Sequence, residues 1–381
     1  MDELMNIPLR ENLEVAEINN ENCRVPRTPH NPFHGLSEAN FIKNFRLSKN
    51  LCMFLIETLE PFMRPKRRAT DLDIQTRVLV ALNFYACGSY QPIIGCSKYL
   101  DVSQPSVCRA IKEVTNALNN PEIFNRWVHF PNNFEQLNNV RLNFSQKHGF
   151  PGVIGCIDCT HVAIVCPPGH DPEHPEHLYV NRKNYHSINV QLICDANLEI
   201  INLNARFPGS THDAYIWGRS NVQPFLRNLH AAGHRDYFLL GDSDYPLRTW
   251  LLILLEENYD PGTPEYNYNT AHKNTRCKIG CCNGVLKNRF RYLLKHRVLH
   301  VKPAKACKII NACIVLHNMC IQYNIPVPDD NDMRDVDFGM MAGNADENDN
   351  ENEGNAYRRI NPELAEGRRA RRHLILNNFV N

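Results

Sequence analysis

Two aspartates follow apolar runs that have the character of buried strands. The run from Gly152 to His161 is apolar up to Asp158, and the run from Tyr237 to Asp242 ends on glycine and a carboxylate. Such patterns predict strands that deliver an acid to an open site. If both strands belong to one sheet, Asp158 and Asp242 converge on the same edge, where they could hold a metal ion.

A third acid stands between these strands in the sequence. Asp213 follows Ser210 and Thr211, either of which can cap a helix whose first turn carries the acid. An acid in that turn also complements the helix dipole, which is its purely structural explanation. Phosphodiester cleavage with Mg²⁺ or Mn²⁺ needs carboxylates from separate elements, because the ions clamp the attacking and leaving oxygens. We therefore predict that Asp158 and Asp242 are catalytic and metal-binding residues, and the His212-Asp213 step between them adds to this evidence.

The chain between the first two acids predicts a β-hairpin. Residues 184–194 and 198–207 have the patterning of strands, and residues 195–197 supply a turn between them. We expect this hairpin to lie beside the strand of Asp158.

A loop before the hairpin is rich in histidines and acids. His170, His174 and His177 alternate with carboxylates, a composition that suits zinc, but the prolines among them prevent the shared geometry of a helix. A zinc site and a solvated loop are the two interpretations of this stretch.

The region before residue 125 is predicted to be helical. Apolar residues recur at helical spacing from Phe41 to Leu59, and a second helix is expected over Asp73–Ala86, ended by Gly88. A further segment covers Ile93–Leu100. Residues 1–40 lack periodicity and contain closely spaced prolines, so we expect an arm there.

A helix beginning after Ser103 completes the outline of a helix-turn-helix. Ser103 can cap this helix and Pro105 suits its first turn. In that arrangement Gln104, Ser106 and Arg109 lie on the exposed start of the recognition helix and contact base edges and phosphates of DNA. The same caps are compatible with a plain helical bundle.

Charge is distributed in blocks along the chain. Residues 41–120 carry 11 Lys and Arg against 6 Asp and Glu, residues 329–353 carry 1 Arg against 10 acids, and residues 358–373 carry 6 Arg against 2 Glu. A basic N-terminal region predicts a polyanionic partner, with an ordinary charged surface as the alternative. Within it, Arg67 and Arg68 belong to a basic run that could contact phosphate, assist nuclear import or lie in a solvated loop.

The C-terminal part is predicted to be an acidic linker followed by a basic tail. The acidic block has too little apolar surface to build a core, so we expect residues 323–381 to be largely disordered. The arginine pairs of the tail could assist nuclear import or contact DNA, and a charged helix is the alternative.

Length and composition restrict the class of protein. A chain of 381 residues with 43% hydrophobic content can form two domains with sizeable cores. We see no apolar run approaching the roughly 18 residues that span a bilayer and no signal-like start, so we expect no membrane association. The 15 cysteines are odd in number and irregularly spaced, which predicts reduced thiols. We expect the protein in the nucleus, with the cytoplasm as a second location.

Six motifs resemble, in order, those of PIF/Harbinger transposases and their domesticated HARBI-like nuclease relatives. They are GCIDCTH (155–161), NRKNYHSINVQ (181–191), PGSTHD (208–213), GDSDYPL (241–247), RFRYL (289–293) and ACIVLHNMC (312–320). The resemblance implies an α/β fold, an RNase H-like mixed sheet flanked by helices, after an all-α helix-turn-helix-like domain. It also implies a divalent metal, DNA as substrate and a Myb-like DNA-binding partner.

The resemblance also sets the expected domains. We expect an arm over residues 1–40, a helical domain over 41–125, a nuclease domain over 150–322 and the tail from residue 323.

The resemblance implies that Asp158, Asp213 and Asp242 are the catalytic and metal-binding acids of the family's set, but the last acid of that set is missing from this chain. Relatives place a glutamate in a motif Ile-Glu-Arg-x-Phe-Gly-x-Leu-Lys, whereas the aligned run here is IGCCNGVLK, residues 279–287, with Gly280 at the glutamate position. Losing a ligand impairs the clamp of a two-metal site, so we predict weak or absent cleavage. Two functions follow: a transposase-derived DNA endonuclease of weakened activity, or a non-catalytic factor that binds DNA or protein.

Overall fold

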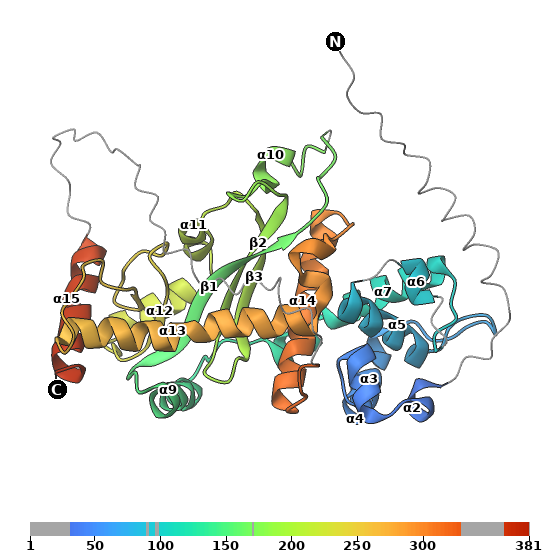
Figure 1. Cartoon of the computed structure of the whole chain (residues 1–381), viewed down its shortest axis with the longest axis horizontal. Coiled ribbons are helices and arrows are strands. Elements are labelled where there is room, and N and C mark those ends of the chain that lie inside the picture. Colours follow the sequence, from blue (N-terminus) through green and yellow to red (C-terminus); the bar gives the residue numbers. More distant parts are fainter. Residues whose placement is uncertain (1–30, 89–90, 96–98, 170, 329–361, 381) are drawn as a thin grey trace, which may run out of the picture.

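The computed structural model describes residues 31–88, 91–95, 99–169, 171–328 and 362–380. A helical N-terminal region adjoins a sheet flanked by longer helices (Figure 1). The elements of the N-terminal region are α2 (Pro32–Gly35), α3 (Glu38–Phe45), α4 (Lys49–Leu59), η1 (Glu60–Phe62), α5 (Ile74–Cys87), α6 (Gln91–Gly95), α7 (Gln104–Leu118) and α8 (Pro121–Trp127).

Polar caps set the starts of the N-terminal helices. The side chains of Ser37, Ser48 and Asp73 each accept a hydrogen bond from the backbone N–H three residues on. Helix α5 ends at Gly88, whose φ of 62° favours glycine. A Cβ at that position would also lie 2.9 Å from the Tyr292 backbone. Helix α5 is the one expected from the sequence, displaced by one residue.

The predicted helix-turn-helix outline corresponds to α6 and α7. Helix α6 ends at Gly95, earlier than expected, where a Cβ would lie 2.2 Å from the Val102 carbonyl oxygen. Helix α7 begins after Ser103 as expected, and Val107 is buried. The Ser103 hydroxyl lies 3.0 Å from Ser106 Oγ and bonds no helix N–H, so the predicted side-chain cap is not formed.

A five-stranded mixed sheet has the order β3-β2-β1-β4-β5. Strands β1 and β2 pair antiparallel, as do β2 and β3, which confirms the predicted hairpin beside the strand of Asp158. Strand β4 pairs parallel to both β1 and β5. This mixed sheet with flanking helices confirms the expected α/β class. The strands are β1 (Val153–Ala163), β2 (Ser187–Cys194), β3 (Ile200–Pro208), β4 (Phe238–Leu240) and β5 (Leu251–Leu252).

Strand β1 does not end at Asp158, which corrects the prediction for this segment. It continues to Ala163 because its antiparallel pairing with β2 extends to the Ala163–Ser187 pair. The parallel pairing with β4 stops earlier, at Cys156 and Leu240. Asp158 therefore lies where the sheet loses one neighbour rather than where its own strand stops.

Helices pack on both faces of the sheet. Cys156 belongs to a core formed with α13 (Pro264–Arg289) and α14 (Pro303–Gln322), whereas Ile157 belongs to a core with residues of α11 (Asp213–Gly218) and α12 (Val222–Ala231). Successive side chains of a strand point to opposite faces, so these cores are two layers. In Figure 1, α13 crosses in front of the sheet. The remaining elements of this region are α9 (Phe134–His148), α10 (Glu176–Tyr179), η2 (Arg291–Leu293) and η3 (Lys295–Arg297).

Helix α14 joins the two regions. Asn318 Nδ2 donates to the carbonyl oxygens of Trp127 and Ile200 at 2.7 and 2.8 Å, and Asn318 Oδ1 accepts from Ile200 N–H at 2.9 Å. The helix is long and apolar enough to cross a membrane by length and composition, but 67% of its apolar window is buried inside the protein. It is a core helix of this fold.

Part of the predicted C-terminal tail is a docked helix, α15 (Pro362–Asn378). Ile375 and Phe379 are buried, and the Arg371 guanidinium donates to the carbonyl oxygens of Ile253 and Leu254 at 3.1 and 2.9 Å. These contacts hold the helix beside β5 and the start of α13, which differs from the largely disordered tail that we expected. Residues 329–361, which include the acidic block, and residues 1–30 of the predicted arm over 1–40 lie outside the described residues.

Candidate active site

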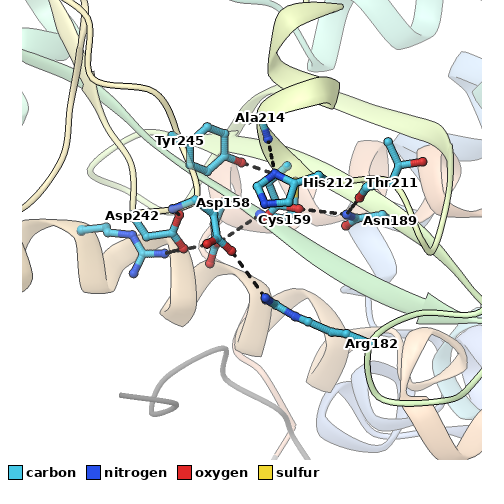
Figure 2. Close-up of polar contacts among 12 residues, drawn as sticks. Asp158, Cys159, Arg182, Asn189, Thr211, His212, Ala214, Asp242 and Tyr245 are labelled. Atoms are coloured by element: carbon cyan, nitrogen blue, oxygen red, sulfur yellow. Dashed lines mark hydrogen bonds and ion pairs between the residues drawn. The ribbon is translucent and has the colours of Figure 1, made fainter. Parts of the chain in front are cut away.

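The parallel pairing of β1 and β4 brings Asp158 and Asp242 together. Cys156 pairs with Leu240, and each acid stands two residues beyond that pair. The two strands therefore bring their acids to the same edge of the sheet, where Figure 2 shows the two side chains next to one another. Asp242 Oδ1 also accepts the Asp244 N–H at 3.1 Å, which fixes the turn after β4.

Arg276, on helix α13, bridges these two acids. One guanidinium nitrogen, Nη2, lies 2.8 Å from Asp242 Oδ2 and 3.3 Å from Asp158 Oδ1. The backbone around Arg276 is held against β1, because Cys156 Sγ contacts the Thr275 carbonyl oxygen at 3.5 Å. Arg276 was not predicted from the sequence, because its partners lie far from it along the chain.

The site concentrates negative charge in a buried setting. Burial raises the pKa of Asp158 to about 7; the Arg276 guanidinium opposes this shift, and Asp242 and Asp213 add to it. Burial also raises the pKa of Asp242, again against Arg276 and with Asp244 contributing in the same direction as burial. Such a cluster favours a bound cation.

Asp213 approaches from the other helix layer. It is the first residue of α11, and the cap is His212, whose Nδ1 accepts the Ala214 N–H at 3.3 Å, rather than Ser210 or Thr211. Asn189 of β2 donates from Nδ2 to Asp213 Oδ1 at 2.9 Å. Asp213 thus belongs to the surroundings of the acid pair but is held by β2, not by Arg276.

A buried polar group next to the acids was also missed from the sequence. The Tyr245 hydroxyl lies 3.4 Å from Cys159 Sγ (Figure 2). Gln191 Nε2 also lies 3.4 Å from this hydroxyl. Burial raises the pKa of Tyr245, so its hydroxyl stays protonated. The tyrosine stands in the GDSDYPL motif, which was the available signal.

Lys287 is a buried cation of α13. Its ammonium donates to Thr160 Oγ1 at 2.6 Å and to the His161 carbonyl oxygen at 3.0 Å. This fixes the extension of β1 past Asp158 against the helix. Arg276 and Lys287 therefore both face β1, but only Arg276 contacts the acid pair.

Gly280 is buried on α13, one helical turn after Arg276. The position is thus on the part of the helix that packs toward the sheet, close to the residue that contacts both acids. We predicted from the sequence that a metal ligand is missing at position 280. Glycine has no side chain that could bind a metal ion.

The acid pair fits a divalent cation in its chemistry. Carboxylate oxygens are the ligands that Mg²⁺ and Mn²⁺ prefer, and Asp158 and Asp242 already share one cation. One ion shared by these two acids fits the site, because Gly280 supplies no side-chain oxygen. Asp213 accepts from Asn189 and adds its charge to the site, since it contributes to the raised pKa of both acids.

Other groups of ligand-type side chains lie in the loop between β1 and β2. Among the described residues, groups that place three ligand atoms within 4.8 Å of one another are Cys166 with Glu176 and His186, and Asp171 with Glu173 and His174. Neither group is the trio of His170, His174 and His177, for which a zinc site and a solvated loop were the two interpretations; His170 lies outside the described residues.

The predicted DNA-contacting residues lie on the surface of the helical region. Gln104, Arg109, Arg67 and Arg68 are exposed and Ser106 is half-buried. Two hydrogen bonds hold the start of the basic run against α7. Glu113 Oε1 accepts the Arg64 N–H at 2.6 Å and an Arg77 guanidinium N–H at 2.7 Å. Because Glu113 stands one turn after Arg109, the basic run begins beside the face that carries Arg109.

The fold and the acid-bearing edge define a DDE-type nuclease domain. The family described as DDE superfamily endonuclease matches residues 157–318 of this chain. This range contains all three aspartates together with α13 and Gly280. DDE superfamily endonucleases use divalent metal, in agreement with the chemistry of the acid pair.

The chain belongs to the HARBI-like family of transposase-derived nucleases. It is 34% identical over 295 residues to Putative nuclease HARBI1 of Bos taurus, and 34% identical over 295 residues to that of Homo sapiens; each match covers 77% of this chain and 80% of the relative. Protein ALP1-like of Arabidopsis thaliana is 22% identical over 284 residues, covering 72% of this chain and 67% of the relative. No solved structure shows a significant match.

Proposed function

We propose that this protein is a metal-dependent DNA endonuclease of the DDE type with weak cleavage. The observation that carries the proposal is the convergence of Asp158 and Asp242 at one sheet edge, beside a helix that bears Gly280 where the family has its last acid. Asp213 is proposed as the third acid, positioned through Asn189.

The residues of the site have separable roles in this function. Asp158 and Asp242 would hold Mg²⁺ or Mn²⁺, which when bound supplies positive charge to the oxygens of a phosphodiester. The carboxylate of Asp158 ionises near neutral pH, since its pKa is about 7. Lys287 and Tyr245 keep β1 and the turn after β4 in place. With glycine at 280, one side of the site lacks a carboxylate, which weakens the clamp.

DNA is the proposed substrate and the helical region its proposed binding surface. The exposed start of α7 and the neighbouring basic run would contact bases and phosphates through Gln104, Ser106, Arg109, Arg67 and Arg68. A Myb-like DNA-binding partner and a nuclear location, with some protein in the cytoplasm, belong to the same proposal.

The test is nicking of supercoiled DNA in Mg²⁺ or Mn²⁺ by the native chain, Asp158→Asn and Gly280→Glu. We expect slow nicking by the native chain, none by Asp158→Asn, and faster nicking by Gly280→Glu. Native cleavage as fast as that of Gly280→Glu would show that the missing glutamate is dispensable. If no variant nicks DNA, the proposed endonuclease activity is wrong.

A non-catalytic role is the second candidate, and Gly280 together with the Arg276 bridge favours it. In this case the chain binds DNA or a protein partner without cutting. Salt-dependent DNA binding without nicking, by the native chain and by Gly280→Glu alike, would support this role over the endonuclease.

A further inference from the structure

Arg276 lies at the point that a shared metal ion would have to take. Its Nη2 contacts Asp242 Oδ2 at 2.8 Å and Asp158 Oδ1 at 3.3 Å. These are the oxygens through which two strands could share one cation. A divalent ion and this guanidinium nitrogen therefore compete for the same electrostatic position.

The hydrogen bonding of the half-buried Arg276 is incomplete. A strong arginine–carboxylate pair is bidentate, with two parallel N–H donors on one carboxylate. Here a single nitrogen serves two different carboxylates, and the buried Nε of Arg276 has no hydrogen-bond partner. An unsatisfied buried donor is costly, so the bridge is held by charge more than by hydrogen-bond geometry.

Lys287 shows what a fixed cation of the same helix looks like. Its ammonium bonds Thr160 Oγ1 and the His161 carbonyl oxygen, groups that take no part in the acid pair. Arg276 and Lys287 thus differ in partners: the lysine bonds backbone and hydroxyl groups, whereas the arginine contacts two ionisable acids.

The side chain of Arg276 can leave without moving its helix. The backbone of α13 is anchored by Thr275 to Cys156 and by the Tyr268 hydroxyl, which donates to the Ile253 carbonyl oxygen at 2.9 Å. The Arg276 side chain itself is 21% exposed, so it has a route to solvent. A rotation about its side-chain bonds that breaks these two contacts would uncover both carboxylates.

We propose that Arg276 is an intramolecular cation that occludes the acid pair, and that divalent metal binds only by displacing it. The inference rests on the proposed function in that it concerns the same acids. It adds that Arg276, which is not a metal ligand, sets the affinity of the acid pair for metal.

Gly280 strengthens this occlusion. An acid at position 280 would stand four residues after Arg276 on the same helix face, the spacing at which opposite charges pair. It could then share the guanidinium that now faces Asp158 and Asp242. This chain has glycine at position 280 and so no competing acid there. The missing glutamate therefore means one metal ligand fewer, and it also leaves Arg276 bound to Asp158 and Asp242.

The test measures Mn²⁺ binding to the metal-stripped full chain by titration calorimetry, without DNA. We expect Arg276→Met to bind Mn²⁺ about ten- to a hundredfold more tightly than the native chain, the factor that corresponds to a charge-assisted hydrogen bond. Arg182→Met is the matched control, because Arg182 is 77% exposed and lies 3.6 Å from Asp244; its affinity should equal that of the native chain. Asp242→Asn in the Arg276→Met background should abolish the gain.

Equal or weaker Mn²⁺ binding by Arg276→Met would overturn the proposal and make the arginine a structural bridge. If Arg276→Met does not fold, as judged by circular dichroism, Arg276→Gln decides by the same criterion, because it keeps a polar side chain without the charge. Since no DNA is used, tighter binding by the variant upholds the occlusion even if no variant nicks DNA. If the native chain nicks DNA but Arg276→Met leaves Mn²⁺ affinity unchanged, the proposed endonuclease function stands and the proposed occlusion is wrong.

Discussion

The two regions of this protein treat charge in opposite ways. At the sheet edge, Asp158 is buried and Asp242 is half-buried, and Arg276 compensates both charges from within the fold. In the helical region, Arg67, Arg68 and Arg109 are exposed. The first arrangement holds a cation already, whereas the second presents cations outward.

This difference teaches that a metal site and a nucleic-acid surface can be lost or kept separately. The proposed cleavage depends on a few buried carboxylates whose geometry fails when one ligand changes. Phosphate binding depends on the number of exposed positive charges, which tolerates single losses. A family member that lost its last acid can therefore retain a binding surface.

The largest effect is expected at the joint between the two regions. Asn318→Ala removes all three hydrogen bonds that tie α14 to Trp127 and Ile200, leaving buried groups unpaired. We expect a loss of about 4 kcal/mol in the free energy of unfolding, measured in urea. Asn311→Ala, on the same helix but half-buried, is the control and should cost under about 1 kcal/mol. Equal losses of unfolding free energy in both variants would mean that Asn318 stabilises the protein no more than Asn311 does.

The next effect concerns acid, and it should arise in the sheet region. Burial lowers the pKa of His272 to about 4, and its Nε2 lies 3.2 Å from the Leu252 carbonyl oxygen. The unfolded chain binds the proton first, so stability is full above the ordinary pKa of 6.5 and falls as pH drops toward 4, by up to about 3 kcal/mol. His272→Gln should lose less stability than the native chain between pH 7 and 4. Parallel pH profiles for the two proteins would contradict this.

A smaller effect is expected on the exposed surface. Replacing Arg67, Arg68 and Arg109 together by alanine should weaken DNA binding about ten- to a hundredfold at low salt and reduce the salt slope by about 3. Mn²⁺ binding should stay unchanged. The matched triple lysine variant keeps the charges and should retain most of the affinity. Fluorescence anisotropy across salt concentrations checks this, and native affinity in the alanine variant would remove this surface from the proposal.

The smallest effect tests whether stability in the helical region is independent of the acid site. Asp73 Oδ1 accepts the Thr76 N–H at 2.7 Å and caps α5. Asp73→Ala should lower the free energy of unfolding by about 1 kcal/mol, whereas Asp73→Asn, which can still cap the helix, should cost less. Thermal melts measure the change. An altered Mn²⁺ affinity in Asp73→Ala would show that the regions are coupled.

The sequence alone determined the elements whose signals are local. The alternation of β2 and β3, the helix between Asp73 and Gly88, and the two strand-associated acids all depend on residues a few positions apart. The absence of glutamate at Gly280 was also readable from the sequence. For these features the periodicity of a strand or helix and the chemistry of a turn are sufficient.

Only the tertiary structure decided how distant residues are paired. It placed Arg276 on two acids from separate strands, extended β1 past Asp158 through its pairing with β2, and docked α15 through Ile375 and Phe379. No local pattern encodes these contacts, because each depends on which surfaces pack together once the sheet and its helices have formed. Because α13 packs against β1, Arg276 is the cation that contacts Asp158 and Asp242.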